Sequence, residues 1–557
     1  MYSNSTASTV LQLPREGRYQ VKVSAFAMQA GPDLAKVALS VDRKVLGTRE
    51  VDASFDEAAV VSWEARLAPG QRLGISFVND YYKPKHKDPK LKGDRNLLPD
   101  WVEVIGPLDE RPPPATAGWF FLRDPERGSR EPMRGASVVA RARPMVTELL
   151  RRTWRRPPSR SDVTTICRLV KEQVASGANF HEGLRVAVTA ALASPRFLFR
   201  IESAPRRSKA ARPLDSWAVA TRLSYGLWGS APDASLLEAA AEGGLEDREG
   251  VLAAAKRMLS DARSAALVPN FAAQWLELPN LIHAEPDPDR FPGFDVAFAA
   301  ELRAETEGFL MEARRRGLPV RSFLTAPFTV VSPRLATHYG LQVAFAPEQS
   351  RALVELPSDR VGPGGLLRHG SILLLTSNAT RTSPVKRGKW VLENLLDAPP
   401  PPPPPGFDSL GDEAGAAASA ATLREELAKH RADPNCAVCN QRLAAIGLAL
   451  ESFAPLGRWR SEDGGQPVDT RAELPGGRQL DGPKELARWL AEGDTLVKTL
   501  LRRFFVFAVG RDTTVDDLLA LELVFQRLPE QPTLDDVVLG VVGMDAFWRR
   551  GAASEKE

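Results

Sequence analysis

The strongest constraint on the fold is a change in the spacing of apolar residues early in the chain. Between residues 18 and 107, apolar and polar residues alternate, and glycine, proline and aspartate separate the alternating segments. A period of two places one set of side chains on one face of a strand, so this region predicts an antiparallel β-sandwich of about a hundred residues. The alternating apolar residues are Tyr19, Val21, Val23, Ala25, Val37, Leu39, Val41, Val61, Trp63, Ala65, Leu67, Leu73, Ile75 and Phe77. Beyond about Arg134 the period becomes helical, so the chain is expected to be multidomain, an N-terminal antiparallel β-sandwich followed by a large mainly α-helical region.

Length and composition limit the class of protein. A chain of 557 residues exceeds one ordinary core and predicts several domains. The net charge of +3, with acids interspersed among the arginines, gives no argument for nucleic acid. The sequence contains no run of about 18 consecutive apolar residues, so no membrane-spanning helix is expected. The first residues show neither a basic nor an apolar signal-peptide region, so a cytoplasmic protein is expected if the sequence starts at its true beginning.

Shifts in composition divide the chain into six regions. A run of prolines, Pro399 to Pro405, predicts a stiff polyproline II spacer within the helical part. The predicted regions are a sandwich at 1–108, a linker at 109–136, and helical regions at 137–204, 213–342, 358–460 (with the proline spacer) and 480–552.

Two loops of the predicted sandwich concentrate side-chain oxygens. They contribute Asn79, Asp80, Asp94, Asn96 and Asp100. Such oxygens suit Ca²⁺, which takes about 6–8 hard ligands, although Asn and Asp also serve simply to form turns. Lysines between Lys83 and Lys92 oppose a divalent cation and equally suit an anionic polysaccharide.

A C-x-x-C pair, Cys436 and Cys439, lies one residue short of a c-type haem attachment signature, because Asn440 stands where the axial histidine is required. Zinc needs further ligands, and a thioredoxin-like pair needs a preceding strand; neither is present. A local disulfide or two packed thiols is the remaining interpretation. Cys167, the third cysteine, is expected to be a small buried residue inside a helix.

A basic, hydroxyl-rich segment precedes another predicted helix. Ser383 is a natural N-cap with Pro384 at the first helical position. The surrounding side chains predict an anion or sugar pocket at a helix N-terminus. Its members are Thr380, Arg381, Ser383, Lys386 and Arg387. Ser383 and Lys386 also spell the S-x-x-K of penicillin-recognising acyl enzymes, but the partner elements of that class are missing.

Further helices are predicted from apolar periodicity and caps at 248–259, 264–278 and 296–316, and Asp162 is expected to cap a helix that contains Cys167. On the helix at 296–316, Glu301, Glu305 and Glu307 lie close in sequence. Paired carboxylates suit acid–base chemistry, but such a pair on an amphipathic helix more often forms a solvated face.

The order strand, Asn-Asp, loop, Asp-Arg-Asn-Leu, Asp-aromatic-Val-Glu-Val, Gly-Pro in the N-terminal hundred residues resembles the calcium-dependent xylan-binding type of carbohydrate-binding module. The resemblance implies the five oxygen-bearing residues above as calcium ligands. The lysine-rich insertion departs from that pattern.

The rest of the chain is similar to the multidomain bacterial family of domain of unknown function 1592, with companion domains 1595, 1588 and 1585. The similarity assigns 137–204 to domain 1595, 213–342 to 1592, 358–460 to 1588 and 480–552 to 1585. The motifs that carry it are Ser194-Pro195-Arg196-Phe197-Leu198-Phe199-Arg200, Leu223-Ser224-Tyr225, Gln274-Trp275-Leu276, Glu305-Thr306-Glu307, His338-Tyr339-Gly340, the stretch from Thr376 to Trp390, and Ala449-Leu450-Glu451.

This second resemblance implies export, and hence a periplasmic or extracellular location, and a C-x-x-C-H motif followed by Met-Asp-Pro. Here the corresponding positions hold Asn440, Leu443, Ala444 and Ala445. Both axial ligands are therefore absent, no haem is expected, and calcium remains the one cofactor left open. The leading hypothesis is an exported carbohydrate-binding or scaffold protein with a degenerate, haem-less cytochrome c motif. The alternative is a redox enzyme or hydrolase acting on polysaccharide, with a separate cytochrome as partner.

Overall fold

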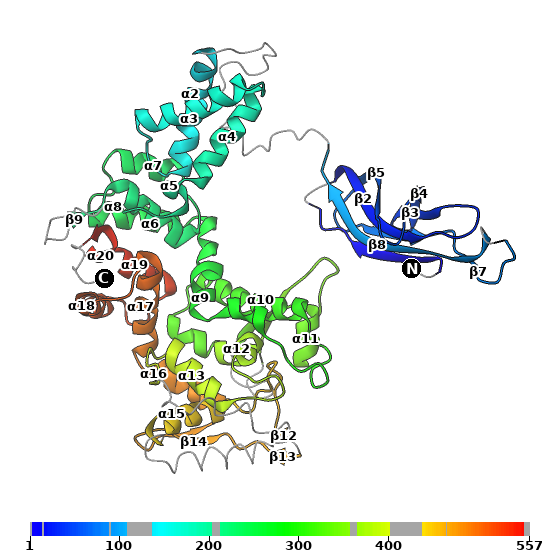
Figure 1. The fold of residues 1–557 in the computed structure, drawn as a ribbon. Coiled ribbons are helices and arrows are strands. Elements are labelled where there is room, and N and C mark those ends of the chain that lie inside the picture. The colour runs from blue at the N-terminus through cyan, green and yellow to red at the C-terminus, as the bar shows by residue number, and fades with distance from the viewer. Residues whose placement is uncertain are drawn as a thin grey trace. The chain divides into compact units, whose positions relative to one another are not determined.

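The computed structural model describes residues 3–13, 16–88, 91–108, 136–202, 212–356, 365–401, 437–463 and 465–550. The chain separates into two compact units, residues 1–122 and 123–557. Strands build the first unit and helices dominate the second (Figure 1). The predicted fold class is confirmed.

The N-terminal unit consists of two four-stranded antiparallel sheets that pack face to face. One sheet has the order β1 (Ser5–Val10), β6 (Arg72–Phe77), β3 (Ala35–Val41), β4 (Lys44–Val51). The other has the order β5 (Ala59–Leu67), β2 (Gly17–Met28), β8 (Gly93–Ile105), β7 (Tyr81–Lys83). The predicted alternating residues fill the core between the sheets, with Val61 partly buried at its margin. Alternation thus fixed which face of each strand is buried.

Strands β2 and β8 form the central pair of the second sheet, and a bulge interrupts their pairing. The register runs from Gln20 opposite Ile105 to Met28 opposite Asn96, and it shifts between Ser24 and Ala25. Opposite this shift, β8 carries one extra residue, Asp100. Because Ala27 and its partner Leu97 both point into the core, the neighbouring Met28 and Asn96 belong to the outer face.

The helical unit begins with three helices that pack on one another, α2 (Ala136–Thr153), α3 (Arg160–Ala175) and α4 (Phe180–Ala193). Ser159, not Asp162, caps α3, while Asp162 is the third residue of the helix and returns a bond to the Ser159 amide. The predicted cap was therefore wrong by three residues, because both members of a capping box are cap-forming residue types. Cys167 is buried and unpaired within α3, as predicted.

The remaining helices share one hydrophobic core that runs from Leu214 to Phe547, so three of the predicted helical regions fold together. None of the helices among the described residues is both long and apolar enough to cross a bilayer. The principal helices are α6 (Ser216–Trp228), α7 (Ala234–Ala241), α8 (Arg248–Leu259), α10 (Val296–Arg315), α11 (Pro333–Tyr339), α12 (Gly370–Leu375), α13 (Pro384–Asn394), α15 (Ala437–Leu448), α16 (Gly482–Glu492), α17 (Thr495–Val509), α18 (Val515–Phe525) and α19 (Leu534–Val542).

The prediction of one continuous helix at 264–278 was wrong. A 3₁₀ segment, Ala262–Ala266, is followed by a π turn, Val268–Ala272, and by the short α9, Ala273–Trp275. Pro269 lies in the π turn and has no amide hydrogen to donate to the preceding turn, which accounts for the break in the regular helix at this point.

Helices α13 and α15 approach each other closely at two glycines. A Cβ atom on Gly388 would lie 2.0 Å from the Leu443 carbonyl oxygen, and one on Gly447 would lie 1.8 Å from the Pro384 carbonyl oxygen. Neither distance is possible for a side chain, so this contact requires glycine at both positions. The contact holds the two helices that flank the proline-rich segment.

Candidate functional sites

Three of the predicted calcium ligands gather at one edge of the N-terminal sandwich. The hairpin of β7 and β8 places Tyr82 opposite Asp94. Asn96 follows Asp94 by two residues and therefore lies on the same face of β8, and Asp80 directly precedes β7. We call Asp80, Asp94 and Asn96, with Tyr82, the acidic edge.

Two features of the acidic edge suit a ligand. Asn96 is 2% exposed, and its Oδ1 atom has no hydrogen-bond partner among the described residues. A buried acceptor without a partner is uncommon, and a cation would satisfy it. The Tyr82 ring is 68% exposed and offers an apolar face beside the carboxylates.

Asn79 and Asp100 do not join this edge. The Asn79 Oδ1 atom accepts from the Lys36 amide at 2.6 Å, and its Nδ2 atom donates to the Leu34 carbonyl at 2.8 Å. The Arg95 guanidinium donates a hydrogen bond to the Asn79 carbonyl oxygen at 2.9 Å. Asp100 lies six residues beyond Asp94 along β8, a separation of about 20 Å at strand spacing. The five residues therefore do not surround one ion.

Within the described ranges, no three side chains of His, Cys, Asp or Glu form a group that could hold a metal ion. A cation at the acidic edge would therefore depend on the two carboxylates, the Asn96 carboxamide and backbone or ligand oxygens. Those residues fit calcium, which accepts neutral oxygens beside carboxylates.

Lysines border the acidic edge. Lys83, at the end of β7, is exposed, as are Lys85 and Lys87 on the loop that follows, and the Lys83 ammonium lies 5.5 Å from the centre of the Tyr81 ring. The Tyr81 hydroxyl donates to the Leu91 carbonyl at 2.7 Å and ties this loop to the hairpin. Exposed lysines therefore lie in and just after β7, with Lys83 on the Tyr81 side of the strand, and Lys90 lies outside the described residues.

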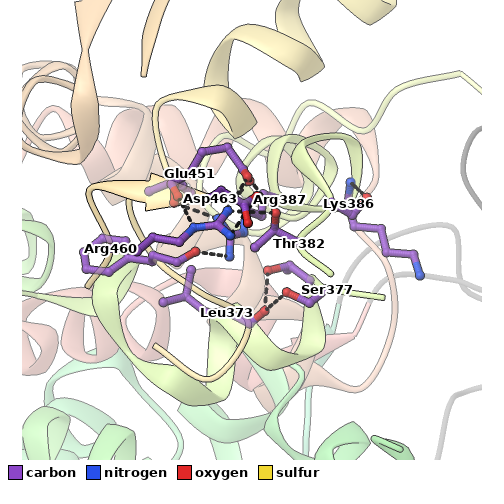
Figure 2. A network of polar contacts seen from close by, with 12 residues as sticks. Leu373, Ser377, Thr382, Lys386, Arg387, Glu451, Arg460 and Asp463 are labelled. Atoms are coloured by element: carbon purple, nitrogen blue, oxygen red, sulfur yellow. Dashed lines mark hydrogen bonds and ion pairs between the residues drawn. The ribbon is translucent and has the colours of Figure 1, made fainter. Parts of the chain in front are cut away.

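The start of α13 is built as predicted, with Ser383 as its N-cap and Pro384 at the first helical position. The Ser383 Oγ atom accepts from the Lys386 amide at 3.3 Å, so capping explains this serine. Thr380 and Arg381 are partly buried, and Lys386 is exposed. Figure 2 shows the Lys386 side chain extending away from the polar cluster that holds Arg387.

Arg387 is 1% exposed and serves the core of the helical unit. It donates to Glu451 Oε1 at 3.0 Å, to the Leu450 carbonyl at 2.7 Å and to the Phe453 carbonyl at 2.8 Å. Burial lowers the pKa of Arg387 to about 10, and the Glu451 charge opposes that change. With Arg387 engaged inside and Lys386 outside, the cations near the helix N-terminus do not converge on one ligand.

Glu451 is the centre of this buried network (Figure 2). Its Oε2 atom accepts from Thr382 at 2.6 Å and from Arg460 at 2.8 Å, in addition to the bond from Arg387 to Oε1. Arg460 also reaches Asp463 at 3.1 Å. The network joins the start of α13 to the turn after α15, and sequence patterns contain no signal for it because its members are far apart in the chain.

A second buried polar cluster lies at Glu305 on α10. Its carboxyl accepts from the Tyr339 hydroxyl at 2.7 Å and from Thr329 at 2.7 Å, and burial raises its pKa. The expectation of a solvated face was wrong for Glu305, which is 1% exposed. Glu307 accepts from Arg303 at 2.7 Å, and Glu301 accepts from Ser332.

Two further buried residues, Arg368 and His369, belong to this cluster and were missed by sequence reasoning. The Arg368 guanidinium lies 5.6 Å from the Tyr339 ring centre, and the His369 Nδ1 atom is 3.0 Å from the Thr306 hydroxyl. Both side chains are at most 1% exposed. The cluster therefore connects α10 to Thr329, to the end of α11 and to the segment that precedes α12, and its members are buried.

The cysteine pair yields little structural detail. Cys436 lies outside the described residues, and the side chains of Cys439 and Asn440 are also outside them, although their backbone belongs to α15. One turn further along, Leu443, Ala444 and Ala445 are buried in the main core. They pack as apolar side chains at the positions where the family pattern has Met-Asp-Pro.

Comparison with known families agrees with this architecture. Residues 20–118 match the Ca-dependent xylan-binding carbohydrate-binding module. Four further segments match families that are each described as a protein of unknown function. In chain order these are DUF1595 at residues 141–202, DUF1592 at 214–341, DUF1588 at 363–463 and DUF1585 at 476–547. The set of domain families inferred from the sequence motifs is confirmed. Among curated proteins, none matches the chain.

Proposed function

We propose that this chain, in which a xylan-binding-type module precedes domains 1595, 1592, 1588 and 1585, binds polysaccharide outside the cytoplasm through its N-terminal module. The match of residues 20–118 is the observation that carries the proposal. The helical body is proposed to carry no haem of its own, because Asn440 replaces the axial histidine.

The acidic edge is the proposed sugar-binding region. The exposed Tyr82 ring offers an apolar surface of the kind that packs on the flat face of a pyranose, and hydroxyl groups of the sugar would meet Asp80 and Asp94. The outer face of the same sheet continues to Trp101, which lies opposite Ser24 and is 42% exposed. The ligand class is xylan or a related, acidic polysaccharide, since the exposed lysines of β7 and of the loop that follows it favour negative charge.

Calcium is proposed as the cofactor of this edge, held by Asp80, Asp94 and Asn96. When bound, the ion would supply coordination positions for a pair of sugar hydroxyl groups. The Asn96 Oδ1 atom without a partner supports this assignment, whereas the lysines nearby weaken the affinity by charge repulsion. We therefore expect weak binding of the ion.

Calorimetric titration of the full chain with xylo-oligosaccharides tests the proposal. Asp94→Asn and Tyr82→Ala should each weaken binding at least tenfold, while Asp469→Asn, which changes an exposed carboxylate in the helical unit, should not. Heat of binding that is unchanged in both module variants would refute the assigned edge. Calcium at a hundred times its dissociation constant should stabilise the module by about 2.7 kcal/mol, and an equal thermal midpoint with chelator would remove the metal from the proposal.

A further inference from the structure

A hollow of about 670 Å³ opens on the helical unit beside the buried Glu451 network, with which it shares Arg460. It lies between the loop before α10, helix α11 and the turn that follows α15. Its volume falls within the range of about 300–1,000 Å³ that is usual for ligand pockets. Four arginines and no Asp or Glu are among its lining residues; the arginines are Arg290, Arg334, Arg458 and Arg460.

Two neighbouring residues that line this hollow, Trp459 and Arg458, have exposed side chains that a ligand can contact. Trp459 is 43% exposed, and its ring forms a T-shaped pair with the Phe453 ring at a centroid distance of 5.3 Å. Arg458 is exposed, and among the described residues it makes neither an ion pair nor a side-chain hydrogen bond. An indole face and an unpaired guanidinium therefore stand side by side in the chain.

The turn that carries both residues is held firmly. The Ala454 amide donates to the Arg458 carbonyl at 2.8 Å, and the Arg460 amide donates to the Ser452 carbonyl at 2.8 Å. Gly457 adopts a φ of 85° where a Cβ would lie 2.9 Å from Gly370, so the turn seats directly on α12. Arg460 is anchored in turn by Glu451. A binding surface on such a turn is organised before the ligand arrives, which reduces the entropic cost of binding.

The other arginines differ in availability. Arg334 pairs with Asp295 at 2.9 Å and its guanidinium lies 4.9 Å from the centre of the Phe298 ring. Arg460 is paired with Glu451 and Asp463. These two arginines help to shape the wall of the hollow, whereas Arg458 has no ion-pair partner within the described ranges and can pair with an incoming anion.

We propose that this hollow binds a uronate unit of an acidic polysaccharide, with the sugar ring stacked on Trp459 and its carboxylate paired with Arg458. Arg458, which has no ion-pair partner among the described residues, favours an anion, and the exposed indole of Trp459 favours a ligand with a flat apolar face. The choice of a sugar rests on the proposed function of the N-terminal module. The body would thereby add a second contact, specific for charge, on the polysaccharide that the module binds.

Titration of the full chain with an oligogalacturonate, monitored by calorimetry and by tryptophan fluorescence, tests this site. Arg458→Ala and Trp459→Ala should each weaken binding at least about tenfold, because a charge-assisted hydrogen bond or a stacking contact is lost. Arg471→Ala removes an arginine that is 75% exposed and paired with Asp469, and it should leave the affinity unchanged. Both test positions are exposed, so the variants should fold.

The possible outcomes separate this site from the module. Loss of uronate binding in Tyr82→Ala but not in Arg458→Ala would place the acidic sugar on the module and overturn the proposal. Binding of inorganic phosphate with the same dependence on Arg458 and no dependence on Trp459 would show an anion site without sugar recognition and would also overturn it. Competition by an acidic peptide that is as strong as by oligogalacturonate would overturn the assignment to a sugar. Retained xylo-oligosaccharide binding in Arg458→Ala, together with lost uronate binding, would support both sites.

Discussion

Replacing Glu451 by glutamine should destabilise the helical unit more than any change to its surface charges. Glu451 is 2% exposed, and its carboxylate receives bonds from Thr382, Arg387 and Arg460. The amide of glutamine removes the negative charge and directs two donors toward groups that are themselves donors. Arg387 would then remain as a buried cation without a counter-charge.

The expected loss is about 3–5 kcal/mol, the cost of breaking a buried ion pair on one side. The lower end of this range applies, because the Leu450 and Phe453 carbonyls would still accept from Arg387. Asp469→Asn is the matched control, since it removes a carboxylate from a pair whose side chains are 75% and 40% exposed. That change should cost about 0–1 kcal/mol.

Urea denaturation followed by the helical circular dichroism signal measures both variants, and linear extrapolation gives the free energies of unfolding. The signal reports on the helical unit because the N-terminal unit is built of strands. A loss below about 1 kcal/mol for Glu451→Gln, equal to that of the control, would refute the view that this network supports the fold.

Three further outcomes are expected. Gly447→Ala should lower the free energy of unfolding by about 3 kcal/mol or more, because its Cβ would lie 1.8 Å from the Pro384 carbonyl oxygen. The control is Gly293→Ala, where a Cβ meets no atom within 4 Å and the free energy of unfolding should change by less than about 0.5 kcal/mol. Equal values for the two variants would contradict the close helix contact. Burial raises the pKa of Glu148, but hydrogen bonds from Arg151 and Arg152 outweigh it and bring the pKa to about 2. The stability from this depressed pKa is present above pH 4.5 and is lost as the pH falls toward 2. After allowance for solvent screening it amounts to about 1–2 kcal/mol. On acid titration Glu148→Gln should therefore lose less folding free energy than the parent, and identical profiles would contradict this role of Glu148. Protein matured in a periplasm should lack covalent haem, and a haem absorbance band that survives denaturation would show this to be wrong.

The sequence predicted those features that depend on local period and caps. Alternation identified the sandwich core because every second residue of a strand faces the same way, and Ser383 with Pro384 marked the start of α13. The helix at 248–259 was also predicted with its exact bounds. Pro269 interrupted the next predicted helix, a case in which one residue outweighs the apolar pattern around it.

The sites were harder to predict because they depend on contacts between distant segments. Arg387 and Glu451 are 64 residues apart, and both lie inside the protein although each belongs to a charged residue type. The same holds for Glu305, whose partner Tyr339 comes from another helix. In the N-terminal module, Asp94 and Asp100 both lie on the long strand β8, which keeps them apart. The order of residues alone does not reveal that one continuous strand contains both. A pattern can thus name candidate ligands, but the register of the strands decides which of them meet.

The most direct test of the account is the mobility of the full chain in native gels that contain soluble xylan. The account predicts that xylan retards the chain, and that Tyr82→Ala restores the mobility seen in gels without polysaccharide. Equal mobility of the parent chain in the presence and absence of xylan, and of a uronate-containing polysaccharide tested in parallel, would contradict the claim that this protein binds polysaccharide.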